Sequence, residues 1–130
     1  MTDFHDMQHF GNGKDGKIAG DCYRACLATI TRLQPEQLRH YAQDCPDSWW
    51  PESQKDVKHL TGLQLECFVT GSIPPENEGL LAIGVGKSPR GDWKHAVVID
   101  PVTLRVVHDP HPSRAGIDGP IIEIYALVVE

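Results

Sequence analysis

Hydrophobic and polar positions follow one period in the first half of the chain and another in the second. Between residues 22 and 62, apolar residues recur every three or four positions, which is the spacing of one helix face. From residue 63 onward they alternate with polar residues or form short continuous runs, which is typical of strands. The sequence therefore predicts an α+β fold, with N-terminal helices packed on a C-terminal antiparallel sheet.

The first helix is expected to follow Asp21, because aspartate is a favourable N-cap residue. One face of this helix would be formed by Cys22, Cys26, Ile30 and Leu33. Residues 1–20 are rich in glycine and have no periodic apolar pattern, so we expect an irregular lead-in before the helix.

Two further helices are expected before the strands. Residues 35–43 would form the second helix, because Pro35 is tolerated in a first helical turn. Its core-facing residues would be Leu38, Tyr41 and Ala42. Residues 53–62 would form the third helix, with Ser53 as its N-cap and Gly62 as its stop.

Five strands are expected after the helices. They cover residues 63–69, 80–85, 95–99, 104–108 and 121–129. A chain of 130 residues, 40% of them apolar, is close to the common size of one domain. We therefore expect residues 1–130 to fold as a single domain around one core.

Charge and the N-terminal sequence narrow the classes of function. The formal net charge is -6 and the basic residues are scattered, whereas nucleic-acid binding needs a clustered cationic face. No apolar stretch is long enough to span a bilayer, and the acidic N-terminus is unlike a signal peptide. We expect a cytoplasmic protein with free thiols and with no nucleic-acid or membrane partner.

Cys22 is the strongest candidate nucleophile. Thiolate is the reactive form of cysteine, and the positive end of a helix dipole lowers the thiol pKa. The small residues Ala19 and Gly20 would let backbone N–H groups approach a substrate oxygen, whereas the Asp21 carboxylate would raise the thiol pKa unless it caps the helix. The alternative is that Cys22 only begins the apolar face that it shares with Cys26.

His95 and Asp109 are the candidate partners of this cysteine. His95 opens one predicted strand, and the next strand leads into Asp109. With a hairpin loop at residues 101–103, Asp109 would lie opposite His95 on the same face. A loop longer by one residue would place His108 opposite His95 instead, so the arrangement depends on register. A cysteine, a histidine and an acid in this order suit nucleophilic acyl transfer.

Two segments of the chain carry a family resemblance. The string GDCYRACLATI around Cys22 resembles the active-site segment of papain-like peptidases, especially the leader-cleaving peptidase domains of bacteriocin exporters. HAVVI followed by VHDP is similar to the catalytic histidine strand of those domains and to the aspartate that precedes a proline. Over residues 8–113, the arrangement also resembles small phage-encoded proteins of that superfamily.

The resemblance implies a papain-like fold with Cys22 as nucleophile, His95 as base and Asp109 as orienting acid. The oxyanion-hole glutamine of the family lies shortly before the cysteine, and Gln8 is the only upstream glutamine here. It would serve only if the glycine-rich segment after it loops back. The resemblance further implies a peptide or protein substrate and no cofactor, and for a phage protein a possible host protein partner.

The loop before the candidate base contains possible substrate-binding residues. They are Ser88, Arg90 and Trp93, which would lie at the rim of the cleft and bind an anionic or carboxylate-bearing substrate. A solvated turn is the alternative, and a phosphate loop is excluded because the glycine spacing is wrong and no helix follows. Trp49 and Trp50 would line a groove or cap the core.

Cysteine and histidine counts raise the possibility of zinc, but the chain has no CxxC pair. Cys26 and Cys67 are expected to be small core residues, and Cys45 a loop thiol without an assigned role. His108 and His111 flank the candidate acid, and either would replace the candidate base in another register.

The sequence thus predicts a cysteine hydrolase that cleaves a peptide, isopeptide or related amide bond. Two alternatives remain open. One is a papain-like binding or inhibitor module without chemistry, and the other is an acyl transferase of the transglutaminase type.

Overall fold

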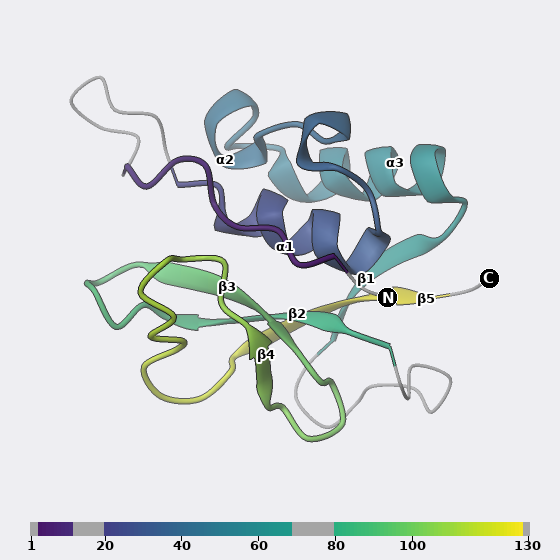
Figure 1. The fold of residues 1–130 in the computed structure, drawn as a ribbon. Coiled ribbons are helices and arrows are strands. Elements are labelled where there is room, and N and C mark those ends of the chain that lie inside the picture. The colour runs from purple at the N-terminus through teal and green to yellow at the C-terminus, as the bar shows by residue number, and fades with distance from the viewer. Residues whose placement is uncertain (1–2, 12–19, 69–79, 129–130) are drawn as a thin grey trace.

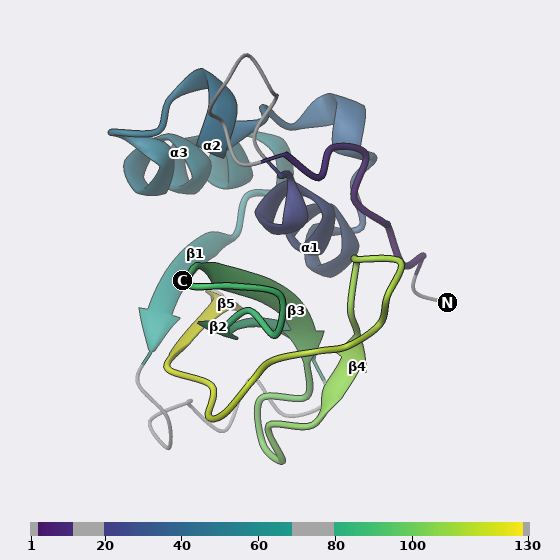
Figure 2. The same cartoon turned by 90° about the vertical axis from the view of Figure 1, so that its left-hand side faces the viewer.

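The helices lie together on one face of a sheet, as Figures 1 and 2 show from two directions. They are α1 (Cys22–Thr31), α2 (Tyr41–Asp44) and α3 (Trp49–Thr61), with a 3-10 turn at Pro35–Gln37 between the first two. The computed structural model describes residues 3–11, 20–68 and 80–128. Helices precede strands in the chain and pack on them, so the predicted α+β class is confirmed.

The sheet has five strands in the order β1-β5-β2-β3-β4, and all neighbouring pairs are antiparallel. The strands are β1 (Gln64–Phe68), β2 (Ala82–Lys87), β3 (Lys94–Ile99), β4 (Val106–His108) and β5 (Glu123–Val128). β1 and β4 form the edges, whereas β2, β3 and β5 are buried over most of their length. Each predicted strand is present, although the bounds differ by a few residues; Val69 of the first prediction and Val129 of the last lie outside the described residues.

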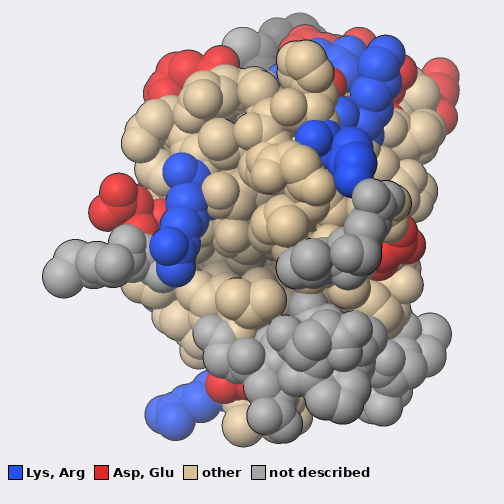
Figure 3. All heavy atoms as spheres, turned by 90° about the vertical axis from the view of Figure 1, so that its right-hand side faces the viewer, with Lys and Arg blue, Asp and Glu red and all other residues tan. Residues whose placement is uncertain are grey.

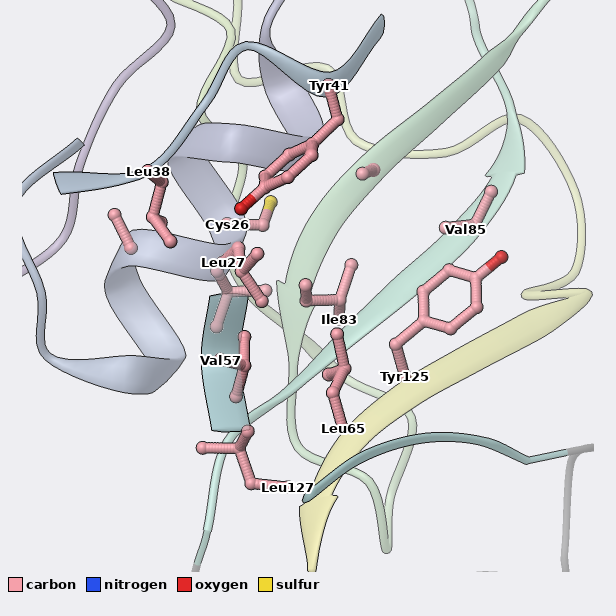
Figure 4. Close-up of a cluster of buried hydrophobic side chains, with 13 residues drawn as sticks. Cys26, Leu27, Leu38, Tyr41, Val57, Leu65, Ile83, Val85, Tyr125 and Leu127 are labelled. Carbon is pink, nitrogen blue, oxygen red and sulfur yellow. The ribbon is translucent and has the colours of Figure 1, made fainter. Parts of the chain in front are cut away.

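The main core lies between the helices and the sheet, and Figure 4 shows its side chains. Its largest buried aliphatic residues are Leu27 from α1, Val57 from α3, and Leu65, Ile83 and Leu127 from the strands. Burying each such side chain contributes roughly 1.5–3 kcal/mol relative to leaving it exposed. This packing holds α1 across β2 and β3 and fixes where the helix begins.

The opposite face of the sheet is covered by the segment between β4 and β5. Ile117 and Ile121 of this segment pack on a second cluster formed by Ala82, Val97, Ile99, Ile124 and Ala126. The sheet therefore divides the expected single core into two. A Cβ on Gly86 would lie 2.4 Å from Cγ2 of Ile117 and 2.8 Å from the carbonyl oxygen of Pro120. Glycine is required here, because a side chain would push the covering segment away.

The prediction of a helix over residues 35–43 is wrong. Pro35–Gln37 forms a 3-10 turn, and Leu38 is extended, with φ at -110° and ψ at 157°, before α2 begins. The extended conformation carries the Leu38 side chain into the core, and this burial outweighs the helical propensity of the segment. Leu38 and Tyr41 face the core as predicted, whereas Ala42 is exposed.

α1 ends at Thr31 instead of Leu33. Arg32 adopts a left-handed conformation, with φ at 61°, and the Leu33 amide donates to the carbonyl oxygen of Ala28 over 3.1 Å. This is the usual way to satisfy the last carbonyl groups of a helix. Leu33 still packs against the core, as its place on the apolar face predicts.

α3 begins at Trp49, earlier than the predicted start at Ser53. Pro51 falls in its first turn, where a missing backbone donor has no cost. Ser53 is buried inside the helix and is not its cap, since its hydroxyl oxygen accepts a hydrogen bond from Tyr23 over 2.9 Å. Gly62 ends the helix with φ at 78°, as predicted.

Surface charge is dispersed on the face drawn in Figure 3. Lysine and arginine side chains there fall into separate groups with uncharged surface between them. Within residues 3–11, 20–68 and 80–128, no helix has the length and apolar content needed to cross a membrane.

Candidate active site

Cys22 is the first residue of α1, and it is partly exposed. It lines a cavity of about 310 Å³ that His95 also lines. The backbone amide of Ala96, which follows His95, hydrogen bonds to the Cys22 thiol. This amide makes no bond to β4, because the pairing between β3 and β4 includes Val98 and Ile99 and stops short of Ala96. The fold therefore brings the candidate nucleophile and base to one cavity.

His95 and Asp109 form a buried pair. His95 is 2% exposed, and its Nε2 lies 2.7 Å from Oδ1 of Asp109. Asp109 also accepts the amide hydrogens of His111 (2.9 Å) and Gly116 (2.7 Å). Burial would raise the pKa of Asp109, but these hydrogen bonds outweigh it and hold the pKa below its ordinary value. Because the ionised carboxylate can only accept, His95 carries its hydrogen on Nε2 and leaves Nδ1 unprotonated.

The register that joins these residues differs from both predicted ones. The paired residues are Ile99 with Val106 and Val98 with His108. Between them the ladder shifts by one residue, as in a β-bulge. Without the shift, strand alternation would put Asp109 on the face opposite to His95; with it, both share a face. The expected loop at 101–103 is extended by Leu104, which has φ at 63° and donates to the Asp100 carbonyl oxygen.

Aromatic rings form much of the cavity wall. The lining residues include Tyr23, Tyr41, Trp49 and Tyr125. Each tyrosine hydroxyl donates to a protein acceptor: Tyr23 to Ser53, Tyr41 to Asp56 and Tyr125 to Glu123. The rings therefore present apolar surface to the cavity. Lys94 and Glu123, paired over 2.8 Å, are its charged lining residues.

At neutral pH, the directions of the two pKa shifts favour the neutral thiol of Cys22 and the neutral imidazole of His95. Burial raises the pKa of Cys22, and the charges of Asp21 and Asp109 raise it further, against the lowering effect of hydrogen bonds that include the Ala96 amide. Burial lowers the pKa of His95, although Asp109 acts in the opposite direction. The thiolate expected at this helix end is therefore not the resting form. Across the described ranges, no hydrogen bond joins the Cys22 thiol to the His95 ring.

Asp21 occupies the N-cap position of α1, but its side chain makes no capping hydrogen bond. Its Oδ1 accepts the amide hydrogens of Gln8 (2.8 Å) and His9 (3.0 Å), and its Oδ2 lies 3.2 Å from Nη2 of Arg24. Asp21 is therefore the N-cap residue by position, as predicted, but its carboxylate does not cap the helix, because the amides of Gln8 and His9 bind it instead.

Gln8 is brought near α1 by this return of the chain, which the Gly20 amide closes by donating to the Gly11 carbonyl oxygen over 2.9 Å. The Gln8 side chain nevertheless does not line the cavity. Its Oε1 accepts a hydrogen bond from Nη2 of Arg24 over 3.0 Å. The structure therefore places the Gln8 side-chain amide on Arg24 and not on the cavity wall.

The three predicted substrate-binding residues lie outside the cavity. Ser88 is fully buried, and its Oγ accepts the Arg90 amide hydrogen over 3.1 Å, so it closes a turn and has no surface for a substrate. Arg90 donates to Oγ of Ser113 over 3.0 Å. Trp93 is 56% exposed and lies against Gly91, where no side chain would fit.

Trp49 and Trp50 combine both predicted roles. Trp49 lines the cavity and packs edge-on against Tyr23, with ring centroids 5.2 Å apart. Trp50 packs on the core and lies 5.0 Å from the ring of Tyr125.

All four cysteines are free. Cys26 is fully buried, as predicted. Cys67 is exposed, contrary to prediction, because it lies on edge strand β1. Cys45 is partly buried against the core. In the described part of the chain, no group of three or more histidine, cysteine or acidic residues is arranged to hold a metal ion.

The histidines that flank the candidate acid make other contacts. His108 bonds through Nε2 to Oδ1 of Asp6 over 2.9 Å. The ring of His111 lies edge-on to that of His95, with centroids 6.3 Å apart. His95 is therefore the histidine that the structure joins to Asp109 through its side chain.

Two groups of residues at the site escape prediction from the sequence. The tyrosines of the cavity wall belong to three different elements, and no local pattern connects them. The residues that hold Asp109 follow it in a polar turn, where Gly116 has φ at 77°. A glycine after the string HPSRA is a local signal for such a turn, although it does not reveal which carboxylate the turn surrounds.

Comparisons with known protein families, with curated proteins and with solved structures found no match. The functional argument for this chain therefore depends on the geometry of its own residues.

Proposed function

We propose that this protein is a papain-like cysteine hydrolase that cleaves a peptide, isopeptide or related amide bond. The observation that carries the proposal is the buried 2.7 Å hydrogen bond between His95 and Asp109, on a cavity that Cys22 also lines. A histidine oriented by a carboxylate beside a thiol is the arrangement that thiol acyl transfer requires.

The resting protonation states support a general-base mechanism. His95 Nδ1 takes the thiol proton as Cys22 Sγ attacks the carbonyl carbon of the substrate. The proton then passes to the leaving amine as the C–N bond breaks, and water hydrolyses the thioester that remains. Asp109 stabilises the imidazolium that forms in each half of the reaction. Closure of the thiol onto the ring would accompany substrate binding, because such contacts tighten in the bound complex.

The start of α1 supplies a donor for the developing oxyanion. The first amides of a helix have no partner within it, and here the Ala25 amide donates to the Asp21 carbonyl oxygen over 3.0 Å. The backbone N–H of Cys22 precedes that bond, at the positive end of the helix dipole. It is the donor that we assign to the developing oxyanion.

The test is hydrolysis of a diverse peptide mixture, followed by mass spectrometry. We expect cleavage by the natural protein, none above background by Cys22→Ala or His95→Ala, and full cleavage by Cys67→Ala. Cys67 is the matched control because it is an exposed cysteine on the sheet edge. Cleavage that survives Cys22→Ala would refute the proposal.

A binding or inhibitor module without turnover is the second candidate. Two observations favour it: the raised pKa of the Cys22 thiol and the engagement of Gln8 by Arg24, away from the cavity. This candidate predicts a ligand that enters the aromatic cavity and binds equally well to Cys22→Ala. Absence of cleavage together with such binding would select it over the hydrolase.

We also propose a cytoplasmic location. Its support is that all four cysteines are free, which is typical of a reducing compartment.

A further inference from the structure

Residues 3–11 lie beside the segment that follows β4, although the two are far apart in the sequence (Figure 2). We call residues 109–116 the acid loop. The Met7 amide donates to the carbonyl oxygen of Pro110 in this loop over 3.0 Å, and the His5 amide donates to Oγ1 of Thr29 in α1 over 3.0 Å. Residues 3–11 therefore connect the helix of the proposed nucleophile to the loop of the proposed acid.

Arg114 is the centre of this connection. Its Nη1 and Nη2 donate to the two carboxylate oxygens of Asp6 over 2.6 Å and 2.9 Å, a paired geometry that lysine cannot reproduce. Nη1 also donates to the backbone carbonyl oxygen of Asp109. His108 completes the cluster through its 2.9 Å contact with Asp6.

The backbone of the acid loop depends on these bonds. Arg114 has φ at 52°, a left-handed conformation that is unfavourable for a residue with a side chain. Two residues later, the Gly116 amide binds the Asp109 carboxylate. A loop released from the Arg114 contacts would relax toward commoner backbone angles and withdraw this amide from Asp109.

Partial exposure limits how much each contact contributes. The side chains of Arg114 and Asp6 are 48% and 50% exposed, and single ion pairs at such sites contribute little to global stability. The expected effect of breaking them is therefore local. It falls on the order of the acid loop and not on the fold as a whole.

We propose that Arg114 is a positioning residue, which locks residues 3–11 onto the acid loop and thereby keeps Asp109 hydrogen bonded to His95. The part of this inference that concerns reaction rate rests on the proposed hydrolase function. The part that concerns the Asp109–His95 hydrogen bond does not.

The test is the proton NMR signal of the His95 Nε2–H group, which a hydrogen bond to a buried carboxylate shifts downfield and protects from exchange. We expect a sharp signal in the natural protein that is broadened or lost in Arg114→Ala and Asp6→Asn. Arg114→Lys should rescue it only in part, because one ammonium cannot replace the guanidinium fork. Arg105→Ala is the control, since it removes an arginine from the β3–β4 hairpin outside this cluster, and it should leave the signal unchanged.

The backbone amide NMR spectrum of each variant distinguishes global unfolding from a local loss of order in the acid loop. If Arg114→Ala does not fold, Asp6→Asn decides, because it keeps the size of the side chain and leaves Arg114 in place. An unchanged His95 signal in a folded Arg114→Ala or Asp6→Asn protein overturns the inference, whether or not the protein is an enzyme.

The effect of Arg114 on reaction rate is tested by steady-state kinetics with any peptide that the protein cleaves. We expect kcat to fall about tenfold in Arg114→Ala with KM nearly constant, because the substrate cavity is not touched. A rise in KM alone overturns the positioning role. If the natural protein cleaves nothing, the proposed function fails, while the NMR signal still decides whether Arg114 holds the Asp109–His95 bond.

Discussion

Two buried aspartates, Asp21 and Asp109, do the same structural work in different parts of the molecule. Each accepts two backbone amides from a segment that lies beside it, Asp21 from the lead-in and Asp109 from the acid loop. Each also lies next to a proposed catalytic residue. Asp109 additionally binds the ring of His95, whereas Asp21 binds Arg24 and makes no bond to its neighbour Cys22.

The difference shows how one residue type can serve or oppose the same chemistry. The charge of Asp109 favours the imidazolium that the reaction forms, and it raises the pKa of His95. The charges of both aspartates raise the pKa of the Cys22 thiol, but of the two only Asp109 is hydrogen bonded to His95. We infer that Asp21 serves the fold, whereas Asp109 serves the proposed reaction.

Asp109→Asn is expected to give the largest effect. An amide can donate to His95 Nε2 and so favours the tautomer that blocks Nδ1, which makes the ring useless as a base. We expect kcat/KM for a cleaved peptide to fall by about 10³-fold or more. Circular dichroism would establish that the variant is folded. Retention of full activity would remove Asp109 from the mechanism.

Asp21→Ala is expected to act mainly on stability. It removes the acceptor of two part-buried hydrogen bonds, those from the Gln8 and His9 amides, which costs about 1–3 kcal/mol of unfolding free energy. Activity per folded molecule should change far less than in Asp109→Asn. Urea unfolding measures the first effect, and peptide cleavage below the melting temperature measures the second. An activity loss equal to that of Asp109→Asn would contradict the contrast between the two carboxylates.

The pH profile gives the smallest and most specific effect. His95 must be unprotonated to act as a base, and burial lowers its pKa below the ordinary 6.5, so the acid limb of kcat/KM should lie below pH 6.5. The pKa of Asp109 is also lowered in the folded protein, so its contribution to stability is present above 3.8 and is lost as pH falls through the folded value. An acid limb of kcat/KM above pH 6.5 would show that the catalytic base is not the buried His95.

The sequence predicts the elements of this fold better than their junctions. Periodicity finds the first and third helices and all five strands, and most of these elements bury an apolar face; β4, whose two valines are exposed, does not. It fails over residues 35–43, where the burial of Leu38 outweighs helical propensity. These errors are local, and they leave the layer order intact.

At the candidate site, too, the sequence predicts the main residues better than the local geometry that joins them. The motifs around Cys22, His95 and Asp109 select residues that the structure brings to one cavity and one hydrogen bond. The register between β3 and β4 was not predictable, because a bulge obeys local backbone geometry and leaves no pattern of apolar positions. The contact between Gln8 and Arg24 was not predictable for a related reason, since the two residues are 16 positions apart in the sequence.

The early end of β4 has a consequence for how this site can change. An exposed strand edge can pair with another extended segment, but β4 ends before it reaches Ala96. The Ala96 amide is therefore not paired with β4, and it hydrogen bonds to the Cys22 thiol. If the β3–β4 hairpin were longer, β4 would reach Ala96, and its backbone would replace the Cys22 thiol as the partner of the Ala96 amide. Such an insertion would abolish the proposed hydrolase activity without changing any residue of the proposed triad.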